Sequence, residues 1–429
     1  MRLSLWISML LIIAVRAAGL AAPCLLAPGC KRVLNENWAM QSSAKVRRGG
    51  AVISTTDFTP QNWYPAQMPA TVLAVLVRNH VYPDPYFGMN LQSIRGASDP
   101  GGQEFSEVPM PPGSPFRPGW WYRTQFDVPA SEKGKELWLH FDGINYRADV
   151  WINGHELATS RQVRGTWRTF TFNVTQLART GARNALAVEV FPPTPHDLAI
   201  TLVDWSSMPP DKDMGIFRDV YLTASGPVTV RHAQVITKLD LPSVAVAHLT
   251  ISADLSNATG RPVRGALKAA IGSISVLRSV RLGPHETRRI IFPPQTDHQL
   301  NIPRPRLWWP WQYGAQNLYQ LRIEFITKGH ASDRQDIQFG IREISSYLGP
   351  KNNRIFTING KRILIRGAGW APDLLLRPSR QREEDQISYV RNLNLNTVRL
   401  EGKLMEDHFF NLCDRSGILV IAGWCCCSH

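Results

Sequence analysis

Residues 139–158 read LHFDGINYRADVWINGHELA, and this stretch predicts a β-hairpin. Val150 and Ile152 stand two positions apart and lead directly into the dipeptide Asn153-Gly154. Both turn residues tolerate positive φ angles, which a tight hairpin loop requires. The stretch therefore favours paired β-strands in the first half of the chain.

The same period-two alternation extends outward from this hairpin over residues 31–225. Apolar residues alternate with small or polar ones in two further segments, which contain Phe170, Phe172 and Val174, and Leu186, Val188 and Val190. Such alternation is typical of strands that bury one face in a core. We expect a β-sandwich in residues 31–225, with a short helix near Ala70–Arg78.

Residues 226–340 continue the alternation with a new set of strands. The apolar positions include the pairs Val244/Val246 and Leu249/Ile251 and the run Leu321, Ile323 and Phe325. A segment of this length with short strands and frequent turns fits a sandwich of the immunoglobulin type. We therefore expect an immunoglobulin-like β-sandwich in residues 226–340.

After Gly340 the pattern changes to alternating strands and helices. Ser379 can cap one helix, and Gly417 can end a second one that carries Met405, Phe409, Leu412 and Cys413 at helical spacing. The expected strands around these helices are Ile363–Arg366, Thr397–Leu400 and Ile418–Ala422. The order β-α-β-α-β predicts a parallel sheet in residues 341–429.

A closed barrel of such units has eight strands and about 250 residues. Residues 341–429 provide only the expected strands named above, so the sequence predicts a partial (β/α)8 barrel. The expected fold class is therefore mainly β, with two sandwiches followed by the first β/α units of an incomplete barrel.

The charge of the chain argues against a nucleic-acid partner. The formal net charge is +14, yet Lys and Arg are scattered, and the densest cluster, Lys45–Arg48, is short. Proteins that bind nucleic acid usually concentrate their positive charge in runs or on one helix face. The 14 tryptophans, by contrast, supply large flat faces that suit packing and sugar rings.

Residues 1–30 have the pattern of a secretory signal peptide followed by a mature N-terminal tail. An apolar run from Leu3 to Val15 is followed by small residues around Ala18–Ala22, which fit a cleavage site. Arg16 ends the run, which is too short for a stable membrane span. We expect a secreted or periplasmic protein. Lipid attachment at Cys24 or Cys30 has weaker support, and an uncleaved apolar tail is the alternative.

The terminal stretch GWCCCSH (423–429) places three cysteines side by side next to a histidine. Contiguous cysteines lack the spacing with which two thiolates clasp one zinc ion. We therefore expect no metal site here, and Trp424 is the informative residue of the stretch.

Four residues at the ends of the expected parallel strands form a candidate sugar site. They are Trp370, Asp373, Glu401 and Trp424, and function in barrels of this kind lies at the carboxyl ends of strands. Indole faces stack on pyranose rings, and carboxylates accept hydrogen bonds from hydroxyls or pair with a cation. Alternatively, the tryptophans fill the barrel mouth, Asp373 caps a turn and Glu401 is a surface residue.

Several segments taken together resemble the N-terminal half of glycoside hydrolase family 2, in particular its exo-β-D-glucosaminidases. The segments are PGWWYRTQFDVP (118–129), LHFDGINYRADVWINGHELA (139–158), VDWSSMPPDKDMGIFRDVYL (203–222), RLWWPWQYGAQNLYQL (306–321), RGAGWAPDLLLR (366–377) and NTVRLEGKLMEDHFFNLCDRSGILVIAGW (396–424). The resemblance implies a jelly-roll domain in 31–225, an immunoglobulin-like domain in 226–340 and part of a catalytic (β/α)8 barrel in 341–429.

The resemblance also implies roles for particular residues. Asp204 and Trp205 match a jelly-roll loop that projects toward the glycone subsite, although a structural turn is the alternative. Glu401 marks the subclass, because related mannosidases tend to carry Trp there and a carboxylate would pair with the C2 ammonium of glucosamine. The implied substrate is an oligosaccharide of the chitosan type or another β-linked sugar, and no cofactor is implied.

Retaining glycosidases use two carboxyl groups about 5 Å apart, one as acid/base and one as nucleophile. In the resembled family both come from later barrel strands, so the resemblance implies that this chain holds neither and is inactive alone. Three alternatives stay open. The chain could be part of a β-mannosidase-like enzyme, it could be a non-catalytic carbohydrate-binding or scaffold module, or a second polypeptide could supply the missing strands.

Overall fold

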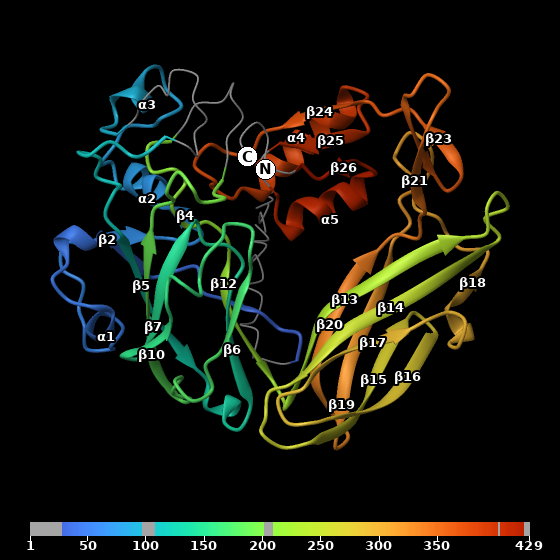
Figure 1. Ribbon diagram of the computed structural model, residues 1–429, viewed down its shortest axis with the longest axis horizontal. Helices are drawn as coiled ribbons and strands as arrows, with labels where there is room; N and C mark the ends of the chain where they lie inside the picture. Colours follow the sequence, from blue (N-terminus) through green and yellow to red (C-terminus); the bar gives the residue numbers. More distant parts are fainter. Residues whose placement is uncertain (1–27, 97–107, 201–208, 402–403, 424–429) are drawn as a thin grey trace, which may run out of the picture.

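The computed structural model describes residues 28–96, 108–200, 209–401 and 404–423. Strands dominate these ranges and form two sandwiches, followed by a smaller region that mixes strands and helices (Figure 1). None of the helices in these ranges is long and apolar enough to span a membrane. Cys30 is disulfide-bonded, and Cys413 is free and buried.

The first sandwich packs a sheet of six strands on a sheet of four. The larger sheet has the order β3 (Tyr64–Ala66), β2 (Trp38–Ser42), β5 (Trp120–Val128), β10 (Ala182–Phe191), β7 (Arg147–Ile152), β8 (His155–Ala158). The smaller has the order β1 (Arg32–Val33), β12 (Val220–Ser225), β6 (Glu136–Phe141), β9 (Phe170–Asn173). One large apolar cluster fills the space between them, so the alternation seen in the sequence corresponds to real inward and outward faces.

The hairpin expected at Asn153-Gly154 is confirmed. It joins β7 to β8, and the φ angles of the two turn residues are 51° and 88°. The helix expected over Ala70–Arg78 is also present, but as the shorter α2 (Val72–Arg78). Ala70 and Thr71 instead form strand β4, which pairs with β11 (Gly215–Ile216). The Thr71 hydroxyl accepts a hydrogen bond from the Ala74 amide and thereby caps α2.

Two short helices, α1 (Gly50–Ile53) and α3 (Asn90–Ser93), also belong to the first sandwich.

The second sandwich pairs two antiparallel sheets. One contains β13 (Val228–Leu239), β14 (Val246–Asn257), β17 (Thr287–Phe292) and β18 (Asn301–Pro303); the other has the order β16 (Ile274–Leu282), β15 (Val263–Ile271), β19 (Tyr319–Thr327), β20 (His330–Phe339). The expectation that Val244 lies in a strand is wrong, because its φ angle of 50° belongs to a turn before β14.

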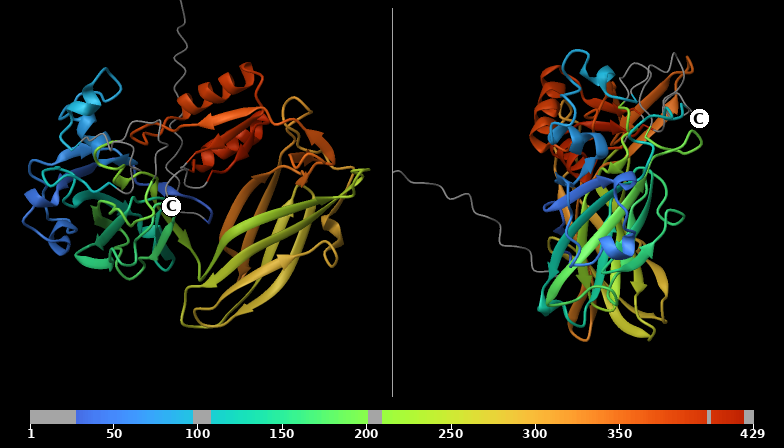
Figure 2. Two further views of the ribbon diagram at one scale, coloured as in Figure 1. Left: turned by 45° about the horizontal axis from the view of Figure 1, so that its top comes forward. Right: turned by 90° about the vertical axis from the view of Figure 1, so that its left-hand side faces the viewer.

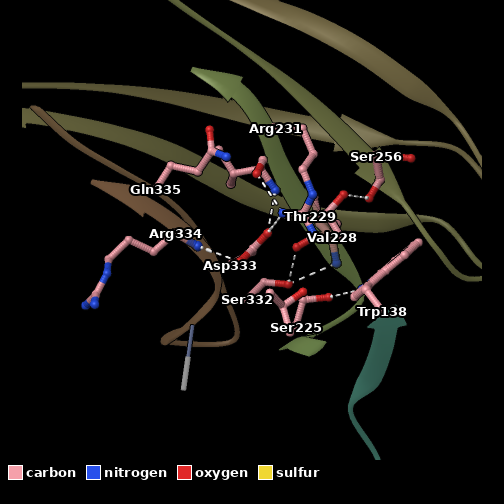
Figure 3. Close-up of polar contacts among 12 residues, drawn as sticks. Trp138, Ser225, Val228, Thr229, Arg231, Ser256, Ser332, Asp333, Arg334 and Gln335 are labelled. Carbon is pink, nitrogen blue, oxygen red and sulfur yellow. Dashed lines mark hydrogen bonds and ion pairs between the residues drawn. The ribbon is translucent and has the colours of Figure 1, made fainter. Parts of the chain in front are cut away.

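The two sandwiches meet at a short junction, which Figure 3 shows in detail. Strand β12 ends at Ser225 and β13 begins at Val228, so two residues connect them. The Ser332 hydroxyl accepts a 2.9 Å hydrogen bond from the Val228 amide and donates a 2.7 Å bond to its carbonyl. Beside it, the buried carboxylate of Asp333 forms an ion pair with Arg231 of β13. These side chains fasten the start of β13 to β20 on the second-sandwich side of the junction.

Residues after Gly340 form a region that we call the β/α region. It opens with an antiparallel sheet of β21 (Ile344–Leu348), β22 (Arg354–Ile358) and β23 (Lys361–Ile363). A parallel sheet follows, with the order β24 (Gly367–Trp370), β25 (Thr397–Leu400), β26 (Leu419–Ile421), connected through helices α4 (Arg380–Asn392) and α5 (Asp407–Ser416). The parallel β-α-β-α-β order expected from the sequence is confirmed within the described residues.

The first expected strand of this region, Ile363–Arg366, is misplaced. Ile363 ends the antiparallel β23, and the parallel strand begins only at Gly367. The cause is the side chain of Asn396, whose Oδ1 accepts from the Arg366 amide and whose Nδ2 donates to the Leu364 carbonyl, both at 3.0 Å. These bonds hold residues 364–366 as a connection, so the apolar run in the sequence is not a strand of the parallel sheet.

Both helix ends expected in the β/α region are confirmed. The Ser379 hydroxyl accepts a hydrogen bond from the Arg382 amide at the start of α4. Gly417 follows α5 with a φ angle of 70°, in the left-handed region that favours glycine. Figures 1 and 2 show the β/α region above both sandwiches, where it lies against each of them. Its contact with the first sandwich positions the candidate site.

Candidate functional site

Glu401 lies directly after β25 and points away from the helices. Val398 and Leu400 belong to the apolar cluster beneath α4 and α5, so the intervening Arg399 faces the other side of the sheet. Oε1 of Glu401 forms an ion pair with Arg399, which places the carboxylate on that same side. A Cβ added to Gly369 of the neighbouring strand would lie 3.2 Å from the Glu401 carboxylate carbon, so the glycine leaves room for it.

Trp370 ends β24 and faces the opposite side of the sheet from Glu401. It pairs with Leu400, is only 8% exposed, and its ring lies 4.8 Å from that of Phe409 in α5. The indole nitrogen is buried and has no hydrogen-bond partner among the described residues. The structure therefore separates Trp370 from Glu401, and one ring face is occupied by core packing. Its role in sugar binding stays a prediction.

Asp373 organises the connection between β24 and α4. Arg377 lies 3.0 Å from each carboxylate oxygen, and Arg382 lies 2.7 Å from Oδ2. Tyr86 of the first sandwich donates a further 3.0 Å hydrogen bond to Oδ2. Burial raises the pKa of Asp373, but the hydrogen bonds and the charge of Arg377, together with the Arg377 and Leu375 amides, outweigh burial and leave the pKa below its usual value. Partners within the protein thus occupy a carboxylate whose sugar contact stays a prediction.

The other three candidate residues, Trp424, Asp204 and Trp205, lie outside the described residues. The description ends at Gly423, so the cysteines of the GWCCCSH stretch are also outside it. Within the described ranges, no group of three His, Cys, Asp or Glu side chains is arranged to hold a metal ion.

Sequence reasoning missed a pocket between the first sandwich and the β/α region. Its walls include Trp167, Phe217 and Arg218 on one side, and Trp370, Leu404 and Glu406 on the other. Arg218 donates to the carbonyl oxygens of Leu404, at 2.6 Å, and Met405, at 3.3 Å. The signal in the sequence is weak: Arg218 and Asp219 follow the short apolar stretch Met214–Phe217, a pattern that is not specific to any function.

Glu406, in the wall of this pocket, has a strongly shifted pKa. Burial is the main cause, and the nearby carboxylate of Asp219 adds to it, while Arg218 acts in the opposite direction. The pKa is raised to about 7, so this carboxyl group changes its charge near neutral pH. The Glu406 carboxyl therefore lies at the contact between the first sandwich and the β/α region. It is on the helix side of the parallel sheet, whereas Glu401 is on the other side.

Two family models match consecutive segments of the chain. Residues 116–234 match the glycosyl hydrolase 2 galactose-binding domain-like model, and residues 228–342 match the glycosyl hydrolases family 2 model. An exo-β-D-glucosaminidase of Streptomyces avermitilis is 38% identical over 392 residues, which is 91% of this chain. The chain belongs to glycoside hydrolase family 2.

Other relatives of this family 2 chain differ in their specificity. A mannosylglycoprotein endo-β-mannosidase of Lilium longiflorum is 29% identical over 91% of the chain. The crystal structure of the Amycolatopsis orientalis exo-chitosanase superposes with a TM-score of 0.82 and 34% identity, covering 93% of the chain. The chain spans 41% of the length of the Streptomyces protein, 42% of the lily protein and 44% of the Amycolatopsis structure.

The likeness covers the two sandwiches and confirms the expected fold class, which is mainly β. Three parallel strands are described in the β/α region, and their membership of a (β/α)8 barrel stays a prediction. The expected boundaries of the domains, at 225/226 and 340/341, also stay predictions.

Proposed function

We propose that this chain contributes the glucosamine-recognising part of a retaining exo-β-glycosidase that acts on β-linked glucosamine oligosaccharides. The observation that carries the proposal is the position of Glu401 at the carboxyl end of a parallel strand, on the side of the sheet away from the helices. Its Oε1 is paired with Arg399, so Oε2 can accept from the ammonium group at C2 of the sugar. The names of the relatives from Streptomyces and Amycolatopsis support the same substrate class.

Hydrolysis by this mechanism requires two carboxyl groups about 5 Å apart. We assign neither role to Asp373 or to Glu401. The Asp373 carboxylate is held by two arginines. Glu401 lies on the side of the parallel sheet away from the helices, whereas Asp373 lies in the segment that connects β24 to α4. We therefore expect the chain alone to bind glucosamine oligomers without hydrolysing them.

Calorimetry with glucosamine oligomers tests the proposal. The full chain should bind them more tightly than N-acetylated or mannose oligomers, because only a free amine carries the charge that Glu401 recognises. The Glu401→Gln variant keeps the size of the side chain and should lose most of this preference. Equal affinity for amino and neutral sugars in the parent chain would contradict the proposal.

An aryl β-glucosaminide tests the second part of the proposal. Purified chain should release no aryl group beyond the background rate. Release that survives repeated purification, and that follows the protein peak in each step, would show that the chain holds its own catalytic pair.

A β-mannosidase-like function is the second candidate, supported by the lily endo-β-mannosidase among the relatives. The two candidates differ at Glu401, because a neutral sugar gains nothing from a carboxylate that seeks an ammonium group. Binding that is retained in the Glu401→Gln variant and is stronger for mannose oligomers would favour this candidate. Binding that is retained without sugar preference would instead favour a carbohydrate-binding module on the sandwiches.

We also propose that the chain is exported, on the basis of the apolar run Leu3–Val15 and the small residues that follow it. Mass spectrometry of the protein secreted by an expressing culture tests this. A mature N-terminus near Ala22 supports export, whereas an intact Met1 retained inside the cell contradicts it.

A further inference from the structure

The second sandwich has a pocket between its two sheets, with a volume of about 390 Å³. Leu249 of β14 and Ile302 of β18 line it from one sheet, and Ile271, Ile274 and Tyr319 line it from the other. Sites for small molecules in proteins begin at about 300 Å³, whereas the space that one water molecule needs is far smaller. The pocket is therefore large enough for a small organic molecule.

The strand register explains why the walls of the pocket are apolar. Ile302 lies opposite Ala247 of β14, and Ile274 lies opposite Ile271 of β15. Residues directly opposite each other in an antiparallel pair share one face of the sheet, so these side chains point toward the core. Ile274 and Ile302 are nevertheless only half-buried. Their uncovered apolar surface would gain from contact with an apolar ligand, and it offers water few hydrogen-bond partners.

Arg306 lines the same pocket from the segment between β18 and β19, and its side chain is exposed. The guanidinium lies over the ring of Tyr319, 5.4 Å from its centre, and the backbone amide of Arg306 donates a 2.9 Å hydrogen bond to the Tyr319 hydroxyl. The Tyr319 ring in turn stacks on that of Phe339, with 5.6 Å between the ring centres. These contacts hold a positive charge at the edge of an apolar pocket.

The charge of this pocket is positive. Among the residues that the structure describes, no carboxylate forms an ion pair with Arg306, and the pocket walls include no acidic residue. The polar residues Ser273 and Gln320, which also line the pocket, are neutral. A guanidinium binds a carboxylate through two parallel hydrogen bonds. An apolar interior with one cation at its edge therefore complements a molecule that has an apolar chain and a single carboxylate.

We propose that this pocket binds a monocarboxylic acid with an unbranched chain of medium length. The chain lies between the two sheets, and the carboxylate pairs with Arg306. The inference is independent of the proposed function, because the pocket contains none of the candidate sugar residues and belongs to the apolar cluster of the second sandwich. A glucosamine unit carries a positive charge, which Arg306 would repel.

Calorimetry of the full chain with decanoate, kept below the concentration at which it forms micelles, tests the proposal. One decanoate should bind per chain. Decanol has the same chain without the charge and should bind about fivefold more weakly, because an exposed ion pair contributes only modestly to affinity. Decyltrimethylammonium, with the opposite charge, should bind more weakly still. Absence of binding, several decanoates per chain, or equal affinity for decanoate and decanol would each overturn the proposal.

Variants at the pocket edge test the role of the positive charge. Arg306→Gln should weaken decanoate binding about fivefold and leave decanol binding unchanged, and Arg306→Lys should restore part of the loss. Arg304→Gln is the matched control, because Arg304 is an exposed arginine two positions away that does not line the pocket. An equal loss in the control would assign the effect to the general surface charge and contradict a contact with Arg306.

Variants of the apolar walls test where the chain lies. Ile274→Phe and Ile302→Phe fill the pocket from opposite sheets, so each should weaken binding of decanoate and decanol alike, by about tenfold or more. The thermal midpoint of each variant without ligand shows whether the sandwich is intact, and the variant that keeps the parent midpoint decides the test. Unchanged affinity in a folded variant of this kind would place decanoate elsewhere and overturn the proposal.

Discussion

The indole nitrogen of Trp308 donates a 2.7 Å hydrogen bond to the backbone carbonyl oxygen of Asp414. Trp308 belongs to the second sandwich and is 1% exposed, whereas Asp414 lies in the last turn of α5. Arg342 completes the contact, because its guanidinium stacks 4.4 Å from the Trp308 ring and its Nη1 lies 3.0 Å from the Asp414 carboxylate. A carbonyl at the end of a helix, which lacks an intrahelical donor, is thereby satisfied by another part of the fold.

Replacing Trp308 by Phe should destabilise the chain by about 1–3 kcal/mol, because the substitution leaves the half-buried Asp414 carbonyl without its donor. Urea denaturation followed by fluorescence measures the change. Trp309→Phe is the matched control, since Trp309 is less buried and lies beside the same contact. Equal losses in both variants would show that ring volume, not the hydrogen bond, is responsible.

Replacing Asp373 by Asn should cost about 1–3 kcal/mol at neutral pH, because two arginines lose their shared charge partner. The folded-state pKa of Asp373 is lowered, so its contribution is present above its unfolded pKa and is lost as the pH falls through the folded value. The stability difference between parent and variant should therefore shrink in acid. A difference that stays constant from pH 7 to pH 3 would contradict this account.

The stability that Glu406 contributes should depend on pH in the opposite direction. Its folded-state pKa is raised to about 7 from an ordinary value of 4.5, so its contribution is fully present below 4.5 and is lost as the pH rises through about 7. The chain should lose about 1–2 kcal/mol between pH 5 and pH 8.5 through this group, allowing for its partial exposure. Glu406→Gln, which stays neutral, should remove this slope. An identical slope in the variant would assign it to other groups.

Replacing Gly417 by Ala should destabilise the chain by about 2–4 kcal/mol. Its φ angle is 70°, and an added Cβ would lie 2.6 Å from the backbone nitrogen of Trp311. Gly272→Ala separates the two causes, because Gly272 also has a positive φ, of 56°, but has no atom within 4 Å of the added Cβ. The control should lose only about 1 kcal/mol. Similar losses in both would leave no role for the close approach to Trp311.

The alternation of apolar residues predicted the sandwiches because it records which side of a strand meets the core. Asn153-Gly154 and Gly417 were predictable for a related reason, since their φ angles demand particular residues at particular positions. These features are local. They depend on a few consecutive residues and on elementary steric rules, so one sequence is enough to read them.

Features that depend on distant residues could not be read in this way. The apolar run at Ile363 is a connection because Asn396, thirty-three positions later, binds its backbone. Trp370 faces the helices because of its pairing with Leu400, and the sequence does not state the direction of a side chain at a strand end. Arg218 gave no usable signal, because its partners are backbone carbonyls, which every residue has.

The contacts of the β/α region turn three parts of the chain into a triangulated frame. The sandwiches are joined by residues 226–227, where the Gly226 amide donates to the Ser332 carbonyl, while Arg218 and Trp308 hold the β/α region against the first and the second sandwich. Two sandwiches joined only at one end could rotate relative to each other, but a third region that contacts both of them fixes the angle between them. The angle between the sandwiches is therefore set at their far ends, by a small parallel sheet, and not only at the short joint where they meet. One spin label on β8 and another on β16 should give a single narrow distribution of distances. This distribution should broaden when the contact of Arg218 or of Trp308 with the β/α region is removed by substitution.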